Sequence, residues 1–175
     1  MIYTSFGSPL GTMTASAEGD TLTGLWFIGG KYCPSDAGTQ GNEPDRPVFM
    51  KLREWLDHYF AGGRNIPLPP LQLEGTPFQR TVWDILLEIP YGQVTTYGKI
   101  AKRIAAARGL RAMSAQAVGG AVGRNAISIL VPCHRVIGAN GSLTGFGGGL
   151  ERKKALLHIE GADTRIRLPF SVGID

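Results

Sequence analysis

A proline-rich stretch, NIPLPPLQLEG at residues 65–75, constrains the fold of this chain most. Three prolines in eleven residues disfavour a helix or a central strand, so we expect an extended connector. The formal charge changes sign across it: 5 Lys/Arg against 8 Asp/Glu give −3 before residue 76, and 13 against 6 give +7 after it. The sequence therefore predicts two domains, at residues 1–72 and 73–165, and an irregular tail at residues 166–175.

The N-terminal part has the pattern of a small sheet with one helix. Apolar and polar residues alternate over residues 2–30, and SPLG and EGD mark turns between the strands. Residues 31–46 are rich in Gly, Pro and polar residues and are expected to form a loop. Pro47 opens a helix whose apolar residues recur at helical spacing as far as Phe60.

The C-terminal part is predicted to be mostly helical. Thr76 is an expected N-cap with Pro77 at the first helical position, and PYG ends that helix near residue 90. An apolar strand is expected before Pro132, and a glycine-rich loop follows at residues 138–149. Further helices are expected over residues 97–107, 114–124 and 151–161. Together the two parts predict an α+β fold.

The cysteines and the hydropathy of the sequence indicate which cellular compartment is expected. Cys33 and Cys133 are the two cysteines, with no CxxC pair, which favours a reducing cytoplasm. The N-terminus has no basic segment followed by an apolar one, and no apolar run approaches the ~20 residues that a membrane span needs. The basic second half indicates either a polyanionic partner or a solvated basic surface.

The expected helix at residues 114–124 consists almost entirely of small residues. Glycine inside a helix costs roughly 0.5–1 kcal/mol relative to alanine, so Gly119, Gly120 and Gly123 require a reason. Small side chains allow another backbone, of protein or nucleic acid, to approach closely. With the helix at residues 97–107, this segment resembles a helix-turn-helix whose connector is longer than usual. Tight packing between helices is the alternative explanation.

The run ISILVPCHRV, residues 127–136, ends in a thiol and an imidazole. A cysteine is mostly protonated at neutral pH, so a nucleophilic Cys133 needs a base or a dipole. Neighbouring side chains of an extended segment point to opposite faces, which favours a water bridge to His134 over a direct contact. Glu160 is a candidate to orient the histidine. These residues alone favour a buried core cysteine, and no close pair of ligands supports a zinc site.

Longer motifs sharpen this interpretation. The segments PFQRTVWDILLEIPYGQVTTYGKIA, AQAVGGAVGRN and PCHRV, followed by GSLTGFGGG, resemble the O6-alkylguanine-DNA alkyltransferases, or methylated-DNA–protein-cysteine methyltransferases, in sequence and order. The resemblance extends from Thr76 to Gly161 and is weaker over residues 1–75. It implies a ribonuclease H-like N-terminal domain with a structural role, and a C-terminal domain that carries the chemistry.

The resemblance also implies a single-use transfer that needs no cofactor and no metal. The thiolate of Cys133 would attack the alkyl carbon on O6 of guanine, or less readily on O4 of thymine, and keep it as a thioether. His134 would act through a water as the base, and Glu160 would complete the relay. Asn125 would tie the small-residue helix to the active-site strand through its amide. A helix C-cap is a second role open to Asn125.

The implied partner is double-stranded DNA, bound through the minor groove with the target nucleotide flipped out. Tyr97 would help to rotate that nucleotide. Lys153 is a further candidate near the loop, unless it belongs to a solvated helix face. The base pocket would be lined by Val136, Phe146 and Gly147, and the DNA contacts would come from Ser114, Gln116, Ala117, Gly120 and Arg124.

The chain departs from the family pattern in three places. Gln116 stands where many members carry an intercalating arginine, so DNA binding is expected to be weaker. Phe146 replaces a common tyrosine, and Gly147 lacks the hydroxyl of some members' serine, so backbone donors would make that contact. The zinc cluster in some members' N-terminal domain has no counterpart in this sequence.

Two other functions compete with alkyl transfer. A helix-turn-helix module could recognise alkylated DNA without transfer, but proteins of that kind replace the cysteine, and this chain has Cys133. A thiol hydrolase would require a separately placed His–Asn pair, which the sequence lacks. The expected protein is a cytoplasmic monomer that contacts no membrane.

Overall fold

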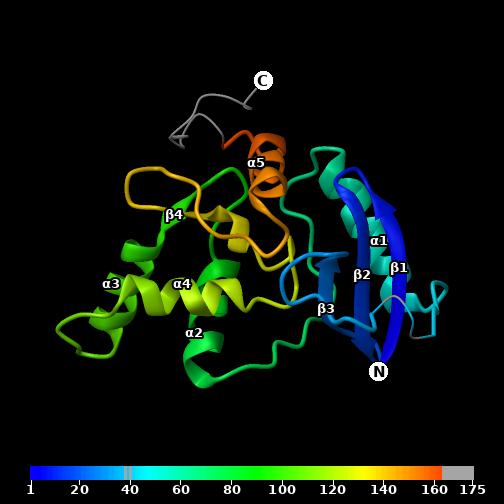
Figure 1. Cartoon of the computed structure of the whole chain (residues 1–175), viewed down its shortest axis with the longest axis horizontal. Coiled ribbons are helices and arrows are strands. Elements are labelled where there is room, and N and C mark those ends of the chain that lie inside the picture. The colour runs from blue at the N-terminus through cyan, green and yellow to red at the C-terminus, as the bar shows by residue number, and fades with distance from the viewer. Residues whose placement is uncertain (38, 40, 163–175) are drawn as a thin grey trace. The chain divides into compact units, whose positions relative to one another are not determined.

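The structure, a computed structural model, describes residues 1–37, 39 and 41–162 (Figure 1). The predicted tail at residues 166–175 lies outside the described residues. The chain divides into two compact units. Of the described residues, the first contains Met1–Glu74 together with Ala126–Leu130, and the second contains Gly75–Asn125 and residues 131–162.

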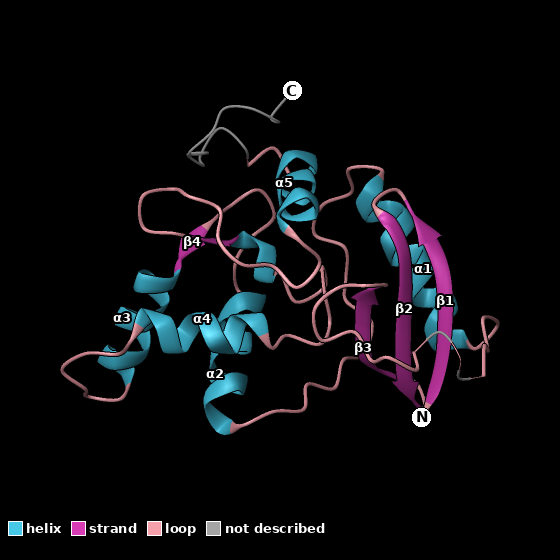
Figure 2. Ribbon diagram, in the orientation of Figure 1, coloured by secondary structure: helices cyan, strands magenta, loops and turns pink. Residues whose placement is uncertain are grey.

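The first unit contains a three-stranded antiparallel sheet in the order β1-β2-β3 (Figure 2). Its strands are β1 Ile2–Ser8, β2 Gly11–Glu18 and β3 Thr21–Phe27. Helix α1, Pro47–Phe60, begins at the predicted proline. Buried apolar residues of β2 and α1 supply much of this unit's core: Met13, Ala15, Ala17, Val48, Phe49, Leu52, Leu56 and Tyr59. The predicted sheet and helix are thus confirmed.

Two distant segments pair with β3. The Leu22 N–H donates to the Pro70 carbonyl at 3.0 Å, which aligns the proline-rich connector with the start of the strand. Further along, the Leu25 N–H donates to the Ala126 carbonyl (2.8 Å) and the Ser128 N–H donates to the Leu25 carbonyl (3.0 Å). A short piece of chain close to Cys133 in sequence therefore belongs to the first unit.

The predicted apolar strand before Pro132 is wrong. Only Ile127 makes a β-bridge, to Leu25, and turns follow over residues 128–130. Ile129 has φ of +70°, a conformation that β-branched residues rarely adopt. The run is apolar because its residues are buried, not because they form a strand, and a short apolar run does not distinguish these two cases.

The second unit contains four helices and one short pair of strands among the residues described. The helices are α2 Pro77–Leu87, α3 Tyr97–Ala107, α4 Ala115–Gly123 and α5 Leu150–Ile159. Strands β4 Thr95–Thr96 and β5 Val136–Ile137 pair in parallel. Between α4 and β5, residues Cys133–Arg135 form a 3₁₀ turn. No helix within the described ranges is long and apolar enough to cross a membrane.

Local capping explains where these helices begin. The Thr76 hydroxyl accepts from the Gln79 N–H (3.2 Å) while the Gln79 side chain accepts from the Thr76 N–H (3.0 Å), which forms a capping box. Ser114 caps α4 by accepting from the Ala117 N–H at 3.2 Å. The Trp83 indole N–H donates to the Ala121 carbonyl (2.9 Å) and so joins α2 to α4.

Candidate active site

Cys133 lies at the start of the 3₁₀ turn and is 7% exposed. The turn is closed by the Arg135 N–H, which donates to the Pro132 carbonyl at 3.0 Å, and the Cys133 N–H donates to the Val131 carbonyl at 2.8 Å just before it. Burial raises the pKa of the Cys133 thiol, and hydrogen bonding by Asn125 and the positive charge of Lys153 oppose that rise. The net direction is upward, so the resting group is a thiol that needs a base before it can act as a nucleophile.

His134 is completely buried, and its two ring nitrogens have different surroundings. Nε2 lies 2.8 Å from Oε1 of Glu160, whereas Nδ1 has no hydrogen-bond partner among the residues described. Burial lowers the pKa of His134, and the adjacent Glu160 only partly offsets this. The imidazole is therefore neutral at neutral pH.

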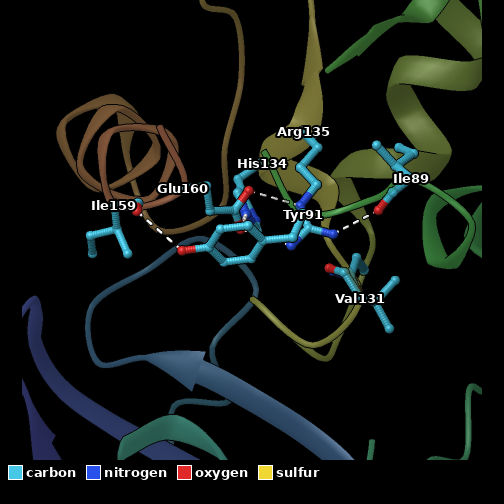
Figure 3. A network of polar contacts seen from close by, with 8 residues as sticks. Ile89, Tyr91, Val131, His134, Arg135, Ile159 and Glu160 are labelled. Carbon is cyan, nitrogen blue, oxygen red and sulfur yellow. Dashed lines mark hydrogen bonds and ion pairs between the residues drawn. The ribbon is translucent and has the colours of Figure 1, made fainter. Parts of the chain in front are cut away.

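Glu160 forms the centre of a buried polar network (Figure 3). Arg135 donates to Oε2 of Glu160 from Nε (2.9 Å) and to Oε1 from Nη2 (2.8 Å), and its Nη1 donates to the Ile89 carbonyl at 2.7 Å. Burial alone would raise the pKa of Glu160, but hydrogen bonds and charges from His134 and Arg135 outweigh it and lower the pKa to about 2. Glu160 is therefore ionised.

The ionised Glu160 determines the tautomer of His134. A carboxylate only accepts hydrogen bonds, so Nε2 carries the ring proton and donates a hydrogen bond to Glu160. Nδ1 then presents a lone pair, as a general base requires. The sequence analysis selected His134 and Glu160 but missed Arg135, although it directly follows His134 in the PCHRV motif.

Lys153 is fully buried, so the interpretation of this residue as part of a solvated helix face is wrong. Its Nζ donates to the carbonyls of Val136 and Thr144, both at 2.6 Å, and of Gly145 at 3.3 Å. Burial lowers the pKa of Lys153 to about 8, with Cys133 acting in the opposite direction. The ammonium thereby connects α5 to β5 and to the glycine-rich loop.

Tyr97 and Val136, two of the predicted pocket residues, lie around this lysine. The Tyr97 ring centroid is 6.0 Å from Nζ of Lys153, and its hydroxyl donates to the Thr144 carbonyl at 3.2 Å. Val136 is fully buried in β5. Phe146 and Gly147 are half-buried in the same loop, and their role at a base stays a prediction.

Helix α4 presents the predicted contact residues on one exposed face. Gln116, Ala117 and Gly120 are exposed, and the opposite face is buried through Val118, Ala121 and Val122. A methyl group added at Gly120 or Gly123 would meet no atom of the described protein within 4 Å, whereas at Gly119 it would lie 3.7 Å from Tyr97. Packing between helices thus does not explain Gly120 and Gly123, and a close external surface remains as the explanation.

Asn125 joins the end of α4 to the turn that carries Cys133. Its Nδ2 donates to the Val131 carbonyl at 2.9 Å, and its backbone N–H donates to the Val122 carbonyl at 3.2 Å. Ser114 and Arg124, at the two ends of α4, are also exposed. In the described part of the chain, no group of three or more His, Cys, Asp or Glu side chains could hold a metal ion.

Comparisons with known proteins cover both units. Residues 77–162 match the family profile "6-O-methylguanine DNA methyltransferase, DNA binding domain", and residues 1–72 match the profile of its ribonuclease-like domain. The methylated-DNA–protein-cysteine methyltransferase of Haemophilus influenzae is 43% identical over 164 residues, which cover 91% of this chain and 86% of the relative. The protein of that name from Mycobacterium tuberculosis is 45% identical over 158 residues, with 90% and 91% covered.

Solved structures agree with these relatives. A crystal structure of Mycobacterium tuberculosis OGT in complex with DNA matches with a TM-score of 0.81 and 42% identity, covering 93% of this chain and 94% of that one. The O6-methylguanine-DNA methyltransferase from the archaeon Pyrococcus kodakaraensis matches with a TM-score of 0.55 and 26% identity, with 91% and 99% covered.

Proposed function

Since this chain belongs to the 6-O-methylguanine DNA methyltransferase family, which repairs alkylated guanine in DNA by transferring the alkyl group to a cysteine, we propose that Cys133 is the acceptor. The observation that carries this assignment is the buried, neutral His134. Its Nε2 is committed to Glu160, and its Nδ1 is left as a base next to the turn that begins at Cys133.

The reaction begins with removal of the thiol proton. A water bridging Sγ and Nδ1 would carry the proton from Cys133 to His134. Glu160, held by Arg135, stabilises the imidazolium that forms. The charge of Lys153 and the hydrogen bond from Asn125 stabilise the thiolate in the buried site.

Transfer is then a single displacement. The sulfur lone pair forms an S–C bond to the alkyl carbon while the C–O6 bond breaks, and its electrons return to the guanine. The guanine that leaves requires one proton at N1, and the proton taken from Cys133 balances this demand. The S–C bond of the thioether product is stable and the thiol is not regenerated. Each molecule therefore acts once, and the transfer needs no cofactor.

DNA would reach this site through α4 and a flipped nucleotide. The exposed glycine and alanine face of α4 suits the narrow minor groove, with Gln116 filling the space left by the target base. Tyr97, at the start of α3, would rotate the nucleotide towards a pocket formed by Val136, Phe146 and Gly147. Ser114, Ala117 and Arg124 would contact the DNA beside it.

The organisation of the chain supports three further assignments. The first 72 residues would serve as a structural domain, and residues 73–165 would bind DNA and transfer the alkyl group. A monomer is sufficient, since the assigned catalytic side chains all come from one unit of one chain. A thiol that must stay reduced suits a reducing cytoplasm.

The decisive experiment is a mass measurement on the Cys133 peptide. The protein is incubated with a duplex oligonucleotide containing O6-methylguanine and then digested. The expected result is the gain of one methyl group on that peptide, absent in Cys133→Ala and unchanged in Cys33→Ala. Tight binding of the oligonucleotide with no gain in mass would overturn the assignment and indicate a protein that recognises the lesion without transfer.

A further inference from the structure

The connector between α3 and α4, residues 108–114, starts with an ordered helix end. Gly109 has φ of +65°, its N–H donates to the Ala106 carbonyl (3.3 Å), and the Leu110 N–H donates to the Ala105 carbonyl (2.8 Å). In this Schellman arrangement the residue after the glycine usually packs an apolar side chain against the helix. The helix offers only the small Ala105 at that position, and Leu110 remains 48% exposed.

Two arginines flank the exposed leucine. Nη2 of Arg108 donates to Oγ1 of Thr81 at 3.3 Å, and its guanidinium lies 5.7 Å from the centroid of the Phe78 ring, so α2 fixes its direction. Arg111 is exposed, and its guanidinium makes no ion pair or hydrogen bond with any residue in the described ranges. The connector thus presents an apolar side chain between two cations.

The chain around the connector carries positive charge only. Between Glu88 and Glu151 the sequence has 62 residues that include seven Lys or Arg and no Asp or Glu. The connector leads directly into α4, whose exposed face includes Gln116 and Gly120. Two of these seven are paired with carboxylates, Arg103 with Glu88 and Arg135 with Glu160. A polyanion that reaches α4 would therefore meet the positive charge of Arg108 and Arg111 on the connector.

We propose that the α3–α4 connector is a second DNA contact, in which Arg108 and Arg111 meet backbone phosphates and Leu110 packs against the sugars and base edges of the minor groove. Arginines on phosphates fix the register of a protein on a duplex, and exposed leucines act as apolar wedges in minor grooves. The inference rests on the proposed function, because α4 must face the DNA for the connector to reach it.

The test compares two connector variants with two matched variants in the first unit. Leu110→Ser is paired with Leu68→Ser, since Leu68 is 43% exposed, and Arg111→Gln is paired with Lys51→Gln on α1. Affinity for an O6-methylguanine duplex is measured by fluorescence anisotropy at several salt concentrations. Transfer from the free base O6-benzylguanine, which needs no DNA, reports whether each variant keeps its active site.

The expected result separates charge from apolar contact. Arg111→Gln should weaken DNA binding about fivefold and reduce the slope of log affinity against log salt by about 0.9, as loss of one phosphate contact requires. Leu110→Ser should weaken binding about threefold with the slope unchanged, because an apolar wedge releases no counterions. Both variants should react with the free base at the wild-type rate.

Two results would overturn the proposal. In the first, the wild-type protein binds and repairs the duplex, but both connector variants bind DNA as tightly as Leu68→Ser and Lys51→Gln do. The proposed function would then stand, and the connector would not be a DNA contact. The other is an unchanged DNA affinity with reduced binding to phosphatidylserine vesicles, which would assign the connector to a membrane surface. A wild-type protein that neither binds nor repairs the duplex would remove the proposed function as well.

Discussion

Asn125 and Cys133 donate hydrogen bonds to the same acceptor, the carbonyl oxygen of Val131, at 2.9 Å from the Asn125 amide and 2.8 Å from the Cys133 backbone. Asn125, two residues after the end of α4, is thereby fixed to the turn that carries the thiol. The five residues between Asn125 and Val131, Ala126–Leu130, belong to the first unit. This shared acceptor therefore sets the position of Cys133 relative to α4.

Replacement of Asn125 by alanine should remove the hydrogen bond that links the end of α4 to the turn carrying Cys133. We expect Asn125→Ala to lose about 1 kcal/mol of unfolding free energy, since the Val131 carbonyl keeps only one of its two donors. The single-turnover rate of methyl transfer should fall by more than this loss of stability explains. Urea unfolding and transfer kinetics check both, with the exposed Asn140→Ala as control. An unchanged transfer rate would contradict the role of Asn125.

The buried carboxylate of Glu160 should make stability depend on pH in acid. Its pKa is about 2 in the folded protein against an ordinary value of 4.5, so the unfolded chain binds more protons between these values. The free energy of unfolding should therefore fall by roughly 3 kcal/mol as the pH drops through this window. Urea unfolding from pH 6 to pH 2 measures it.

Glu160→Gln should lose this acid dependence, because glutamine does not titrate. The matched control is Glu151→Gln, whose side chain is 88% exposed, and it should keep the wild-type profile. If the two variants show the same pH profile, the acid sensitivity does not arise from Glu160.

Transfer should persist below the ordinary pKa of histidine. Burial lowers the pKa of His134 from 6.5, and the neutral ring is the active base. The single-turnover rate should therefore reach half its maximum at a pH below 6.5. For stability the sign is the same as for Glu160: the folded state resists protonation of His134, so unfolding becomes easier as the pH falls below 6.5. The transfer rate is measured between pH 5 and pH 8. A half-maximal rate at a pH above 6.5 would contradict the prediction for the base.

Lys153 should control the order of the glycine-rich loop as well as the thiol. Lys153→Met keeps the length of the side chain but removes the donor from three carbonyls. We expect slower transfer, together with faster amide exchange over residues 142–149, because the loop loses its connection to α5. Lys102→Met, on the exposed face of α3, should change neither. Protection of the loop equal to wild type would contradict the anchoring role.

Gly120→Ala should have opposite effects on stability and on DNA binding. The added methyl group meets no protein atom within 4 Å, and alanine is favoured over glycine in a helix by up to about 1 kcal/mol. The melting temperature should therefore rise. Affinity for duplex DNA should fall, because the methyl group would occupy the groove that α4 enters. Equal or tighter DNA binding would indicate that this face of α4 does not meet the duplex.

Local signals explain which parts of the fold the sequence predicted. Thr76 and Ser114 begin their helices through hydrogen bonds from a backbone N–H three positions later. Pro47 opens its helix through its fixed backbone φ, with no side-chain cap. The alternation over residues 2–30 likewise predicted a small sheet, because sheet pairing there is between neighbours in sequence.

The errors all involve contacts between distant residues. Residues 126–130 resembled a strand because they are apolar, but their burial depends on β3, about a hundred positions earlier in the chain. Lys153 stands between two other basic residues, and only the fold reveals that its ammonium is held by three carbonyls. Arg135 directly follows His134 in the PCHRV motif, but only the fold reveals that it binds Glu160, 25 residues away.

The pairing of β3 with Ala126–Leu130 bears on how such proteins can recombine. A crossover at the proline-rich connector would exchange the first 74 residues as if they were a complete module. In the recombinant, the segment equivalent to Ala126–Leu130 would come from the other parent. It would have to pair with the inherited β3 through the hydrogen bonds of Leu25. The two halves of the gene are thus expected to evolve as a matched pair, with the strongest mutual constraint only a few codons upstream of the reactive cysteine.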